Sequence, residues 1–319
     1  MSAHHGHDHD HDENHHSLGP PRLEEIDKDV FAYIQPDGTW WINNTAFLAA
    51  GDGVVVVDTC ATEQRTRAFL QTLGTVSSQP IRLLVNTHHH GDHTHGNYLT
   101  HPATIVGHTR CREAMITTGI SHYDGVFEPV EWGHLELAPP IVTFDDHLDV
   151  YAGDTKMELH YIGTPAHTTN DIVGWLPDRR VLIAGDLVFN GGTPFMVMGS
   201  VRGSLDALDR VRSFGAERIV PGHGPVCDAS IVDDLYAYSE LVLDVAQRAN
   251  EARVGALEAA RETDLGRFAE WTDPERLVGN LHRAIFELGG AGRGEAIDVT
   301  AAIGDMLAYN GGRPLRCVA

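Results

Sequence analysis

The segment from His88 to His93 contains four potential metal ligands, which are His88, His90, Asp92 and His93. They directly follow the apolar run 81–85 (Ile-Arg-Leu-Leu-Val), which predicts a buried strand that ends where the ligands begin. Side chains two positions apart on an extended backbone point the same way, so His88 and His90 can reach one ion. A turn at Gly91 can direct Asp92 and His93 toward a second ion. Carboxylates beside imidazoles suit borderline divalent metals such as zinc, so the spacing predicts a metal site, and one built for two ions.

The charge of the chain is strongly acidic. Lys and Arg number 23 against 45 Asp and Glu, which gives a formal net charge of −22. This balance argues against a nucleic-acid backbone or an anionic membrane surface as the main partner. Carboxylates that bind metal would account for part of the excess.

The cysteines and the hydropathy pattern bear on the compartment. Cys60, Cys111, Cys227 and Cys317 are far apart and form no Cys-x-x-Cys pair. That pattern favours free thiols in a reducing compartment over a disulfide framework. No stretch has the length of a membrane span, and the N-terminus has no apolar signal core. We therefore expect a cytoplasmic protein.

Composition divides the chain into three parts. The segment 3–16 (AHHGHDHDHDENHH) is polar and of low complexity, which predicts a disordered tail over residues 1–20. Its interleaved Asp, Glu and Asn argue against a purification tag. The tail could be a weak metal-gathering arm or a solvated leader with incidental metal affinity. Residues 21–228 then form the main domain, and residues 229–319 form a C-terminal helical extension.

Apolar and alternating segments predict strands through most of the main domain. They cover residues 30–34, 40–50, 54–57, 81–85, 105–106, 141–144, 157–162, 171–176, 181–184 and 218–220. The Gly51-Asp52-Gly53 turn is a hairpin signal. Helices are predicted over 63–73, from about Asn97, and over 205–214 with Ser204 as the N-cap. Two half-repeats of strands with helices outside predict an α/β fold of two sheets packed face to face between helical layers.

The last ninety or so residues are rich in Ala, Leu, Glu and Arg, and three segments have an amphipathic helical period. These segments are 231–261, 274–288 and 297–309. Ser230 and Asp233 resemble a capping box at the start of the first. The extension could pack on the main domain, shape a substrate pocket or form the contact of a homodimer.

Three more ligand candidates stand alone, each at the end of a predicted strand and beside or near a glycine. They are His167 in Gly163-Thr164-Pro165-Ala166-His167, Asp186 in Ala184-Gly185-Asp186, and His223 in Pro221-Gly222-His223-Gly224. Glycine lets the backbone approach closely and direct such a side chain. A lone His or Asp is more often structural than a ligand, but three in the same setting beside a dense cluster reverse that expectation.

Together these residues resemble the metallo-β-lactamase superfamily. The resemblance rests on His-x-His-x-Asp-His at 88–93, on His167, Asp186 and Pro-Gly-His-Gly at 221–224, and on the strand ending Val57-Asp58-Thr59; it covers residues 30–225. It implies a four-layer αββα sandwich. It also implies that His88, His90 and His167 bind one metal, that Asp92, His93 and His223 bind a second, and that Asp186 bridges both. Asp58 would orient a ligand or the loop, or serve only the fold.

The chemistry implied by the resemblance is hydrolysis. Two divalent ions, most readily zinc, with iron or manganese as alternatives, would hold a bridging hydroxide that attacks a polarised carbonyl. Asp92 and Asp186 would act in catalysis, Asp92 by orienting the nucleophile or relaying a proton. No Gly-x-Ser-x-Gly nucleophile motif is present.

Several positions depart from the pattern or leave two interpretations open. β-Lactamases of the superfamily usually have another residue, often Cys, where Asp186 stands, so the bridging Asp resembles the thioesterase, lactonase and nuclease branches. Ala166 replaces a common glycine, which should leave ligation intact. His95 could line the pocket or cap a helix, and His89 should point away from the metals. The apolar loop 190–199 could be a substrate wall or an ordinary buried loop.

We therefore expect a metal-dependent hydrolase that cleaves a thioester, ester or lactone of a small acyl substrate. The basic residues that hold glutathione in hydroxyacylglutathione hydrolases have no match here. A β-lactam hydrolase, an iron-dependent sulfur dioxygenase with the same ligands, and a zinc-buffering protein acting through the histidine-rich tail are the alternatives. Specificity should reside in loops 110–140 and 190–203 and in the C-terminal helices.

Overall fold

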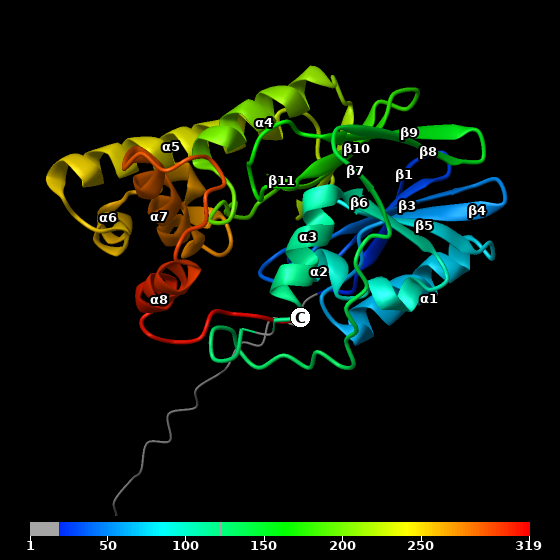
Figure 1. Ribbon diagram of the computed structural model, residues 1–319, viewed down its shortest axis with the longest axis horizontal. Helices are drawn as coiled ribbons and strands as arrows, with labels where there is room; N and C mark the ends of the chain where they lie inside the picture. Colours follow the sequence, from blue (N-terminus) through cyan, green and yellow to red (C-terminus); the bar gives the residue numbers. More distant parts are fainter. Residues whose placement is uncertain (1–18, 122) are drawn as a thin grey trace, which may run out of the picture.

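The computed structural model describes residues 19–121 and 123–319 (Figure 1). The tail predicted for residues 1–20 lies almost entirely outside the described residues; Gly19 and Pro20 belong to no helix or strand. The described chain forms two β-sheets between helical layers, which confirms the predicted α/β architecture (Figure 1).

The first sheet has seven strands that lie side by side in sequence order. They are β1 (Arg22–Asp27), β2 (Val30–Ile34), β3 (Thr45–Ala50), β4 (Gly53–Val57), β5 (Ile81–Asn86), β6 (Thr104–His108) and β7 (Val142–Phe144). Neighbours are antiparallel from β1 to β4 and parallel from β4 to β7. The loops that follow β4 and β5 therefore leave the sheet at the same edge.

The second sheet has five strands in the order β12-β11-β10-β9-β8. They are β8 (His147–Ala152), β9 (Thr155–Tyr161), β10 (Ile172–Leu176), β11 (Val181–Phe189) and β12 (Arg218–His223). β11 and β12 are parallel, whereas the other neighbours are antiparallel. The carboxyl ends of β11 and β12 thus meet at one edge, as those of β4 and β5 do.

Helices cover the outer faces of both sheets and build one end of the molecule. They are α1 (Glu63–Val76), α2 (Gly91–Thr94), α3 (Thr109–Thr118), α4 (Val201–Ser213), α5 (Ile231–Ala252), α6 (Ala256–Glu262), α7 (Arg276–Leu288) and α8 (Val299–Tyr309). Short 3-10 turns occur at Asn97–Thr100 and Gly266–Glu270. Among the described helices, none combines the length and the apolar character that crossing a membrane requires.

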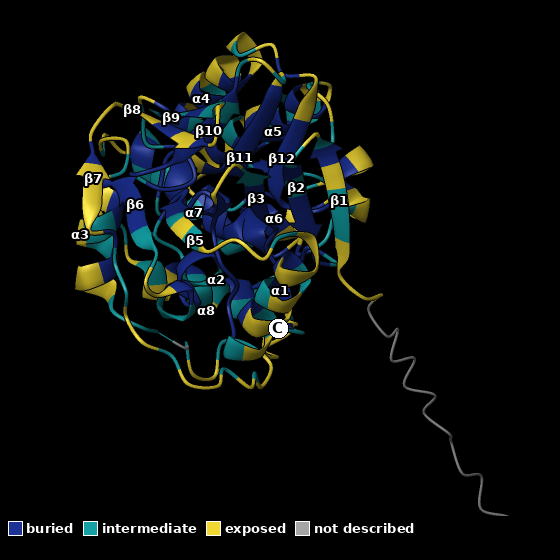
Figure 2. Ribbon diagram, turned by 90° about the vertical axis from the view of Figure 1, so that its right-hand side faces the viewer, coloured by how far each residue is buried: buried dark blue, intermediate teal, exposed yellow. Residues whose placement is uncertain are grey.

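The four valines of β4 explain why this strand lies in the middle of the layers. Val55 and Val57 belong to the core between the two sheets, while Val54 and Val56 pack beneath Phe69 of α1. A strand that is covered on both faces needs a continuous apolar run rather than an alternating one. Figure 2 shows the buried residues concentrated in the strands between the layers.

Several predicted element boundaries are wrong, each for a local reason. The strand predicted over 40–50 begins only at Thr45, because Trp41 has a left-handed backbone (φ 66°) in a turn closed by Ile42 N–H to the Thr39 carbonyl. β1 and β8 were absent from the prediction, since their exposed polar residues hide the alternation. The helix predicted from Asn97 is a single 3-10 turn.

Helix starts and breaks also differ from the prediction. α4 begins at Val201, because the Ser200 hydroxyl, and not Ser204, accepts the capping hydrogen bond from Gly203 N at 2.9 Å. The capping box predicted at Ser230 is wrong, because that side chain makes no capping bond. The helix predicted over 231–261 is two helices, which separate at Arg253 with a left-handed φ of 58°.

The C-terminal helices pack on the rest of the chain. Val232 and Leu235 of α5 lie in the cluster that covers the second sheet, and Met196 and Val201 of the main domain lie in the core of the helical bundle. α7 and α8 run beside the edge of the sheets where the loops gather (Figure 1). The boundary near residue 228 stays a prediction, since no gap in packing marks it.

Candidate metal centre

All seven predicted ligands meet at the shared edge of the two sheets. His88 and His90 lie in the loop after β5, and Asp92 and His93 lie in α2. His167 lies in the loop between β9 and β10, Asp186 lies within β11, and His223 is the last residue of β12. Segments more than a hundred positions apart therefore contribute side chains to one place.

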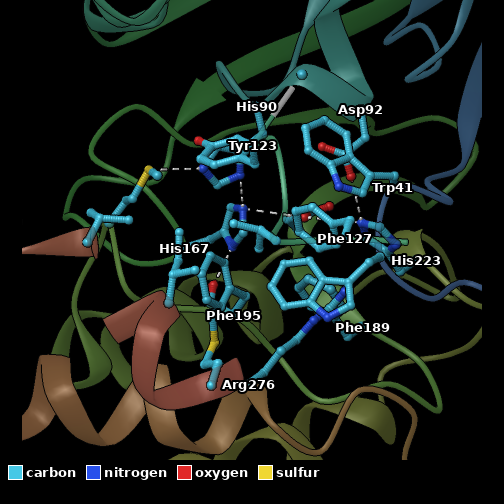
Figure 3. Close-up of a pocket in the computed structure, with 18 residues that line it drawn as sticks. Trp41, His90, Asp92, Tyr123, Phe127, His167, Phe189, Phe195, His223 and Arg276 are labelled. Carbon is cyan, nitrogen blue, oxygen red and sulfur yellow. Dashed lines mark hydrogen bonds and ion pairs between the residues drawn. The ribbon is translucent and has the colours of Figure 1, made fainter. Parts of the chain in front are cut away.

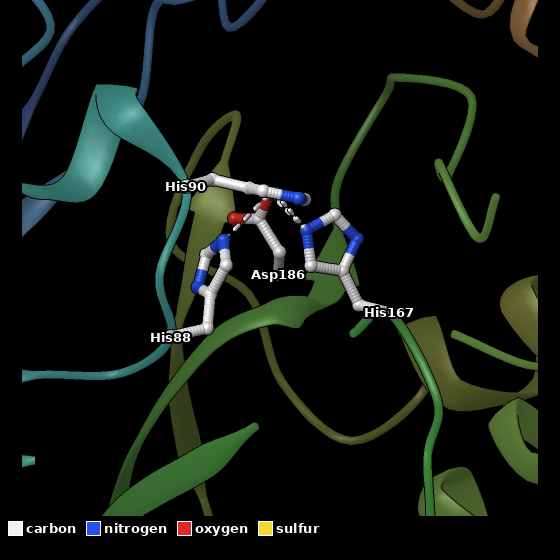
Figure 4. Close-up of side chains that lie close together, drawn as sticks. All are labelled: His88, His90, His167 and Asp186. Carbon is white, nitrogen blue, oxygen red and sulfur yellow. Dashed lines mark hydrogen bonds and ion pairs between the residues drawn. The ribbon is translucent and has the colours of Figure 1, made fainter. Parts of the chain in front are cut away.

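The seven side chains form two groups, and in each group the potential ligand atoms lie within 4.8 Å of one another. The first group is His88, His90, His167 and Asp186; the second is Asp92, His93, Asp186 and His223. Figure 4 shows the Asp186 carboxylate between the imidazoles of the first group. The division matches the one implied by the resemblance, and Asp186 belongs to both groups.

Asp186 contacts both groups through its two carboxylate oxygens. Oδ2 lies 3.3 Å from His167 Nε2 and 3.4 Å from His223 Nε2, and Oδ1 lies 3.0 Å from His93 Nε2. A carboxylate in this position can hold two cations at once.

Hydrogen bonds from outside the groups orient the imidazoles. His93 Nδ1 lies 2.8 Å from Asp58 Oδ2, and His88 Nδ1 lies 3.0 Å from the Thr87 hydroxyl. That hydroxyl donates to the same Asp58 oxygen at 2.6 Å, while Thr87 N–H donates to Asp58 Oδ1 at 2.8 Å. Asp58 is thus placed to orient ligands of both groups, in keeping with the orienting role considered for it.

Backbone carbonyls orient two further ligands. His167 Nδ1 donates to the Phe195 carbonyl at 2.5 Å, and His223 Nδ1 donates to the Gly38 carbonyl at 3.0 Å. Each bond leaves Nε2 facing the centre, in the tautomer that a metal needs. His90 is turned the other way, with Nδ1 2.8 Å from His167 Nε2 and Nε2 3.4 Å from Met198 Sδ.

The polar atoms at the centre fit a divalent cation. His88 Nε2 is buried without a hydrogen-bond partner among the described residues, and His93 Nε2 faces Asp186 Oδ1 without hydrogen-bond geometry. Buried polar atoms without partners are costly unless something binds them. The donor set of imidazoles and carboxylates is the one that zinc and similar metals take.

The carboxylates and imidazoles at the centre strongly shift one another's pKa values. Burial by itself raises the pKa of Asp92 and Asp186, but the imidazole of His93 lowers both below the ordinary range. Burial lowers the pKa of His223, and the Asp186 and Asp92 carboxylates reverse this and raise it to about 9. In His88 burial prevails, helped by His93, and the pKa falls well below its usual value. The centre thus holds ionised carboxylates that a cation would stabilise.

Glycines let the chain approach closely at Asp186 and His223, as predicted, whereas a Cβ on Gly163, before His167, would meet nothing within 4 Å. A Cβ on Gly222 would lie 1.9 Å from Asp186 Oδ1, which no real structure permits. Gly185 has a left-handed φ of 52°, and a Cβ there would lie 2.8 Å from the Thr87 side chain. The residues before Asp186 and His223 are therefore glycine for steric reasons.

A pocket of about 680 Å³, open to solvent, ends at the ligands (Figure 3). Most of its lining is aromatic or aliphatic. The lining residues are Trp40, Trp41, His90, Gly91, Asp92, Tyr123, Val126, Phe127, His167, Asp186, Phe189, Phe195, Met198, His223, Arg276, Val299, Ile303 and Met306. Half of them come from loops 110–140 and 190–203 and from α7 and α8, the regions predicted to determine specificity. The others, among them Trp40, Trp41 and Phe189, come from elsewhere in the main domain.

The structure also places His89, His95 and the loop 190–199. His89 joins neither group and lies 3.1 Å from Asn170 Nδ2, so it points away as predicted. His95 Nδ1 lies 3.2 Å from the Ala61 carbonyl, and its ring stacks on Trp41 at 5.7 Å. In the loop 190–199, Phe195 and Met198 line the pocket while Met196 is buried, so both interpretations of that loop hold in part.

Sequence reasoning missed several residues that shape the site. Thr87, which links His88 to Asp58, directly precedes the predicted ligands and could have been found by its position. Trp41 and Tyr123 line the pocket from segments without a ligand motif, so nothing local indicated them. Asn280 and Arg283 of α7 hold the loop that contacts His167, and helical periodicity does not distinguish such contacts.

Comparison with known proteins agrees with the fold and with the family that the sequence resembles. Residues 38–223 match the sequence model of the metallo-beta-lactamase superfamily. The chain is 25% identical over 230 residues to a linear primary-alkylsulfatase of Pseudomonas, covering 59% of this chain and 43% of that protein. It is 27% identical over 205 residues to a beta-lactamase-like protein 2 homolog of Caenorhabditis elegans, covering 62% and 60%. A hydroxyacylglutathione hydrolase of Rhodospirillum rubrum is 27% identical over 140 residues, covering 44% and 46%. The chain thus spans less than two thirds of each of these relatives.

Solved structures show the same fold. A metallo-beta-lactamase from Pontibacter korlensis superposes with a TM-score of 0.58 at 20% identity, covering 69% of this chain and 99% of that one. The DIM-1 metallo-beta-lactamase superposes with a TM-score of 0.57 at 17% identity, covering 70% and 98%. The predicted αββα sandwich is therefore confirmed, and the C-terminal helices lie beyond residues 38–223, which match the family model. The chain belongs to the metallo-beta-lactamase superfamily.

Proposed function

We propose that this chain is a dinuclear hydrolase that cleaves the thioester, ester or lactone bond of a substrate with an apolar acyl group. One observation carries the proposal: Asp186 is shared by two ligand groups at the closed end of a pocket with mostly apolar walls. Zinc is the metal that the donor set favours, with iron and manganese as alternatives.

Two bound ions would supply a nucleophile from water at neutral pH and would polarise the scissile carbonyl. The residues of the chain hold and complete this arrangement. Asp186 holds the two groups at a fixed separation. Asp92 lines the pocket as an ionised carboxylate, 3.3 Å from His223 Nε2, where it can accept a hydrogen bond from the attacking water and direct it. This is the role that we assign to Asp92.

The pocket walls favour an uncharged substrate. Arg276 is the one Lys or Arg among the pocket residues, and its Nη2 is paired with Asp273 Oδ2 at 2.8 Å. A free cation for a carboxylate on the substrate is thus absent from the lining that the structure describes. An anionic thioester of the glutathione type would find no partner there, and the net charge of −22 would repel it.

The aromatic part of the wall indicates how the apolar group is held. Trp40 lies between the rings of Phe127 and Phe195, with centroids 5.4 and 5.0 Å away. Ile303 and Met306 of α8 complete the wall opposite the metal ligands. Burial of a medium-length acyl chain against these side chains would contribute about 0.8 kcal/mol per methylene.

We also propose a cytoplasmic location. Cys60, Cys111, Cys227 and Cys317 are all free thiols in the structure. That state suits a reducing compartment.

Metal analysis and a substrate panel test the function. Full-length protein should carry about two more zinc ions per chain than a His88→Ala, His223→Ala double variant, a difference that cancels metal held by the N-terminal histidines. The panel compares neutral thioesters, esters and lactones of increasing acyl length with a glutathione thioester, a β-lactam and a linear alkyl sulfate.

We expect the specificity constant to rise with acyl length and to be lowest for the glutathione thioester. A preference for the β-lactam or the alkyl sulfate would show that the substrate belongs to that class and not to the thioesters, esters and lactones. A single iron with no hydrolysis would support the dioxygenase alternative, and an absence of any metal difference would contradict the proposal.

A further inference from the structure

We propose that Asn280 of α7 is a positioning residue for His167, so that the C-terminal helices complete the first ligand group. The inference rests on the metal-binding role proposed above. It assigns a function to a part of the chain that lies beyond the residues matched by the family.

The Asn280 side-chain amide bonds to the backbone on both sides of Phe195, whose carbonyl orients His167. Asn280 Nδ2 donates to the Pro194 carbonyl at 2.8 Å, and Asn280 Oδ1 accepts from Met196 N–H at 2.8 Å. Phe195 lies between these two contacts, and its carbonyl accepts the hydrogen bond from His167 Nδ1 at 2.5 Å. Asn280 is fully buried, so water does not compete for these bonds.

Two neighbours on the same face of α7 extend the contact. Arg276 Nη1 donates to the Thr193 carbonyl at 3.0 Å, and Arg283 Nε donates to the Val197 carbonyl at 2.8 Å. Residues at 276, 280 and 283 follow the spacing of one helical face. All three are buried, and the backbone of residues 193–197 supplies a partner to each. This face of α7 therefore specifies the conformation of that segment.

The packing leaves this segment little freedom to move. A Cβ on Gly279 would lie 2.7 Å from Val197 Cγ2 and 3.2 Å from Phe195 Cε2, so α7 approaches closely because this residue is glycine. Figure 3 shows Phe195 between Arg276 and His167. The same loop brings Met198 Sδ to 3.4 Å from His90 Nε2. Two of the three histidines of the first group thus contact a loop that α7 holds.

The second group is held differently. Its histidines, His93 and His223, bond through Nδ1 to Asp58 and to the Gly38 carbonyl. In the part of the chain that the structure describes, neither Asp58 nor Gly38 makes a hydrogen bond to α7. A change at Asn280 should therefore lower the affinity for the ion of the first group and leave the affinity for the ion of the second group unchanged. A general loss of stability would not select between them.

The test titrates metal-free, full-length protein with Co²⁺ and follows the visible absorption of the bound ion and its affinity. Asn280→Ala removes both loop contacts, and Asn280→Asp keeps the acceptor for Met196 N–H but loses the donor to Pro194. Tyr238→Phe is the matched control, because the Tyr238 hydroxyl contacts Asn280 Nδ2 at 3.2 Å in the same helix interface but not the loop. Thermal unfolding of each variant is measured alongside.

We expect Asn280→Ala to lower the affinity for one of the two Co²⁺ ions by about tenfold and to change the absorption of that ion. The affinity for the other ion should stay the same, and Tyr238→Phe should bind both ions as the wild type does. The affinity of Asn280→Asp for the ion of the first group should lie between those of Asn280→Ala and the wild type. Wild-type affinities for both ions in Asn280→Ala would overturn the inference. Failure of both Asn280 variants to fold, while Tyr238→Phe folds, would also overturn it, since Asn280 would then serve the core. If the wild type itself binds no pair of ions, the proposed function fails first.

Discussion

Asp58 Oδ2 accepts a hydrogen bond from His93 Nδ1 at 2.8 Å, across 35 positions of sequence. Asp58 stands at the end of β4 with a left-handed φ of 62°, a conformation that costs free energy in a residue other than glycine. Its three hydrogen bonds to Thr87 and His93 offset that cost. The first parallel pair of the seven-stranded sheet, β4 and β5, is thereby linked through the ligand loop.

Asp58→Ala should lower metal affinity and hydrolytic activity by about 10- to 100-fold, because His93 and Thr87 lose the acceptor that orients them. Metal retained after dialysis and the rate on the best substrate of the panel measure this. Asp52→Ala is the control, since Asp52 lies on an exposed hairpin and pairs only with exposed Arg82. Unchanged metal content in Asp58→Ala would show that Asp58 serves only the fold.

Asp186→Ala should lose both ions, whereas His88→Ala and His223→Ala should each lose mainly one. The reason is that Asp186 belongs to both ligand groups and each histidine belongs to one. Activity should fall by at least about 100-fold in all three. Elemental analysis gives the metal content, and a single ion retained by Asp186→Ala would contradict a bridging role.

Gly222→Ala should abolish tight metal binding, because the new Cβ would lie 1.9 Å from Asp186 Oδ1 and would displace the carboxylate. Gly74→Ala is the control: Gly74 lies in α1 with open space around its Cβ position. That substitution should raise stability by about 0.5–1 kcal/mol and leave activity unchanged. Thermal unfolding and activity of both proteins check the pair.

Stability of the metal-free protein should fall with acid partly because of His89. Burial lowers the pKa of His89 from 6.5 to about 4, with help from His167. The unfolded chain therefore binds the proton first, so this contribution is present above about pH 6.5 and is lost as the pH falls toward 4. His89→Gln should reduce the loss of unfolding free energy between about pH 7 and pH 5 by about 2 kcal/mol. Denaturant unfolding of both proteins at the two pH values measures it, and equal losses would contradict the assignment.

Arg276→Ala should destabilise the protein by about 3 kcal/mol, because it leaves the Asp273 carboxylate buried without its cation. The two side chains are 2% and 5% exposed, and the Arg276 guanidinium lies 4.0 Å from the centre of the Trp40 ring. Removal of both charges in the Arg276→Ala, Asp273→Ala protein should recover part of the loss. Denaturant unfolding of the single and double variants tests this, and purely additive losses would contradict a coupled pair.

The ligands could be predicted because short stretches of the sequence contain both the ligating residue types and the strand and glycine signals beside them. His88 to His93 form a dense cluster after an apolar strand, and Asp186 and His223 stand beside glycines whose small size the close approach requires. The strand predicted to end at Ala184 continues to Phe189, so Asp186 lies within it and not after it. The valines of β4 likewise indicated a strand, which the structure covers on both faces. β1 and β8 escaped prediction because their exposed residues carry no apolar alternation.

Residue type and short-range periodicity were enough to predict that metal ligands lie at or near buried strands and that two sheets lie between helices. Tertiary structure alone decided that Asp186 stands between the two groups and that Asn280 of α7 supports the loop beside His167. It also brought Trp41, Tyr123 and Ile303 into one pocket. These contacts join residues tens to hundreds of positions apart, and their partners are often backbone atoms, which leave no mark on the sequence.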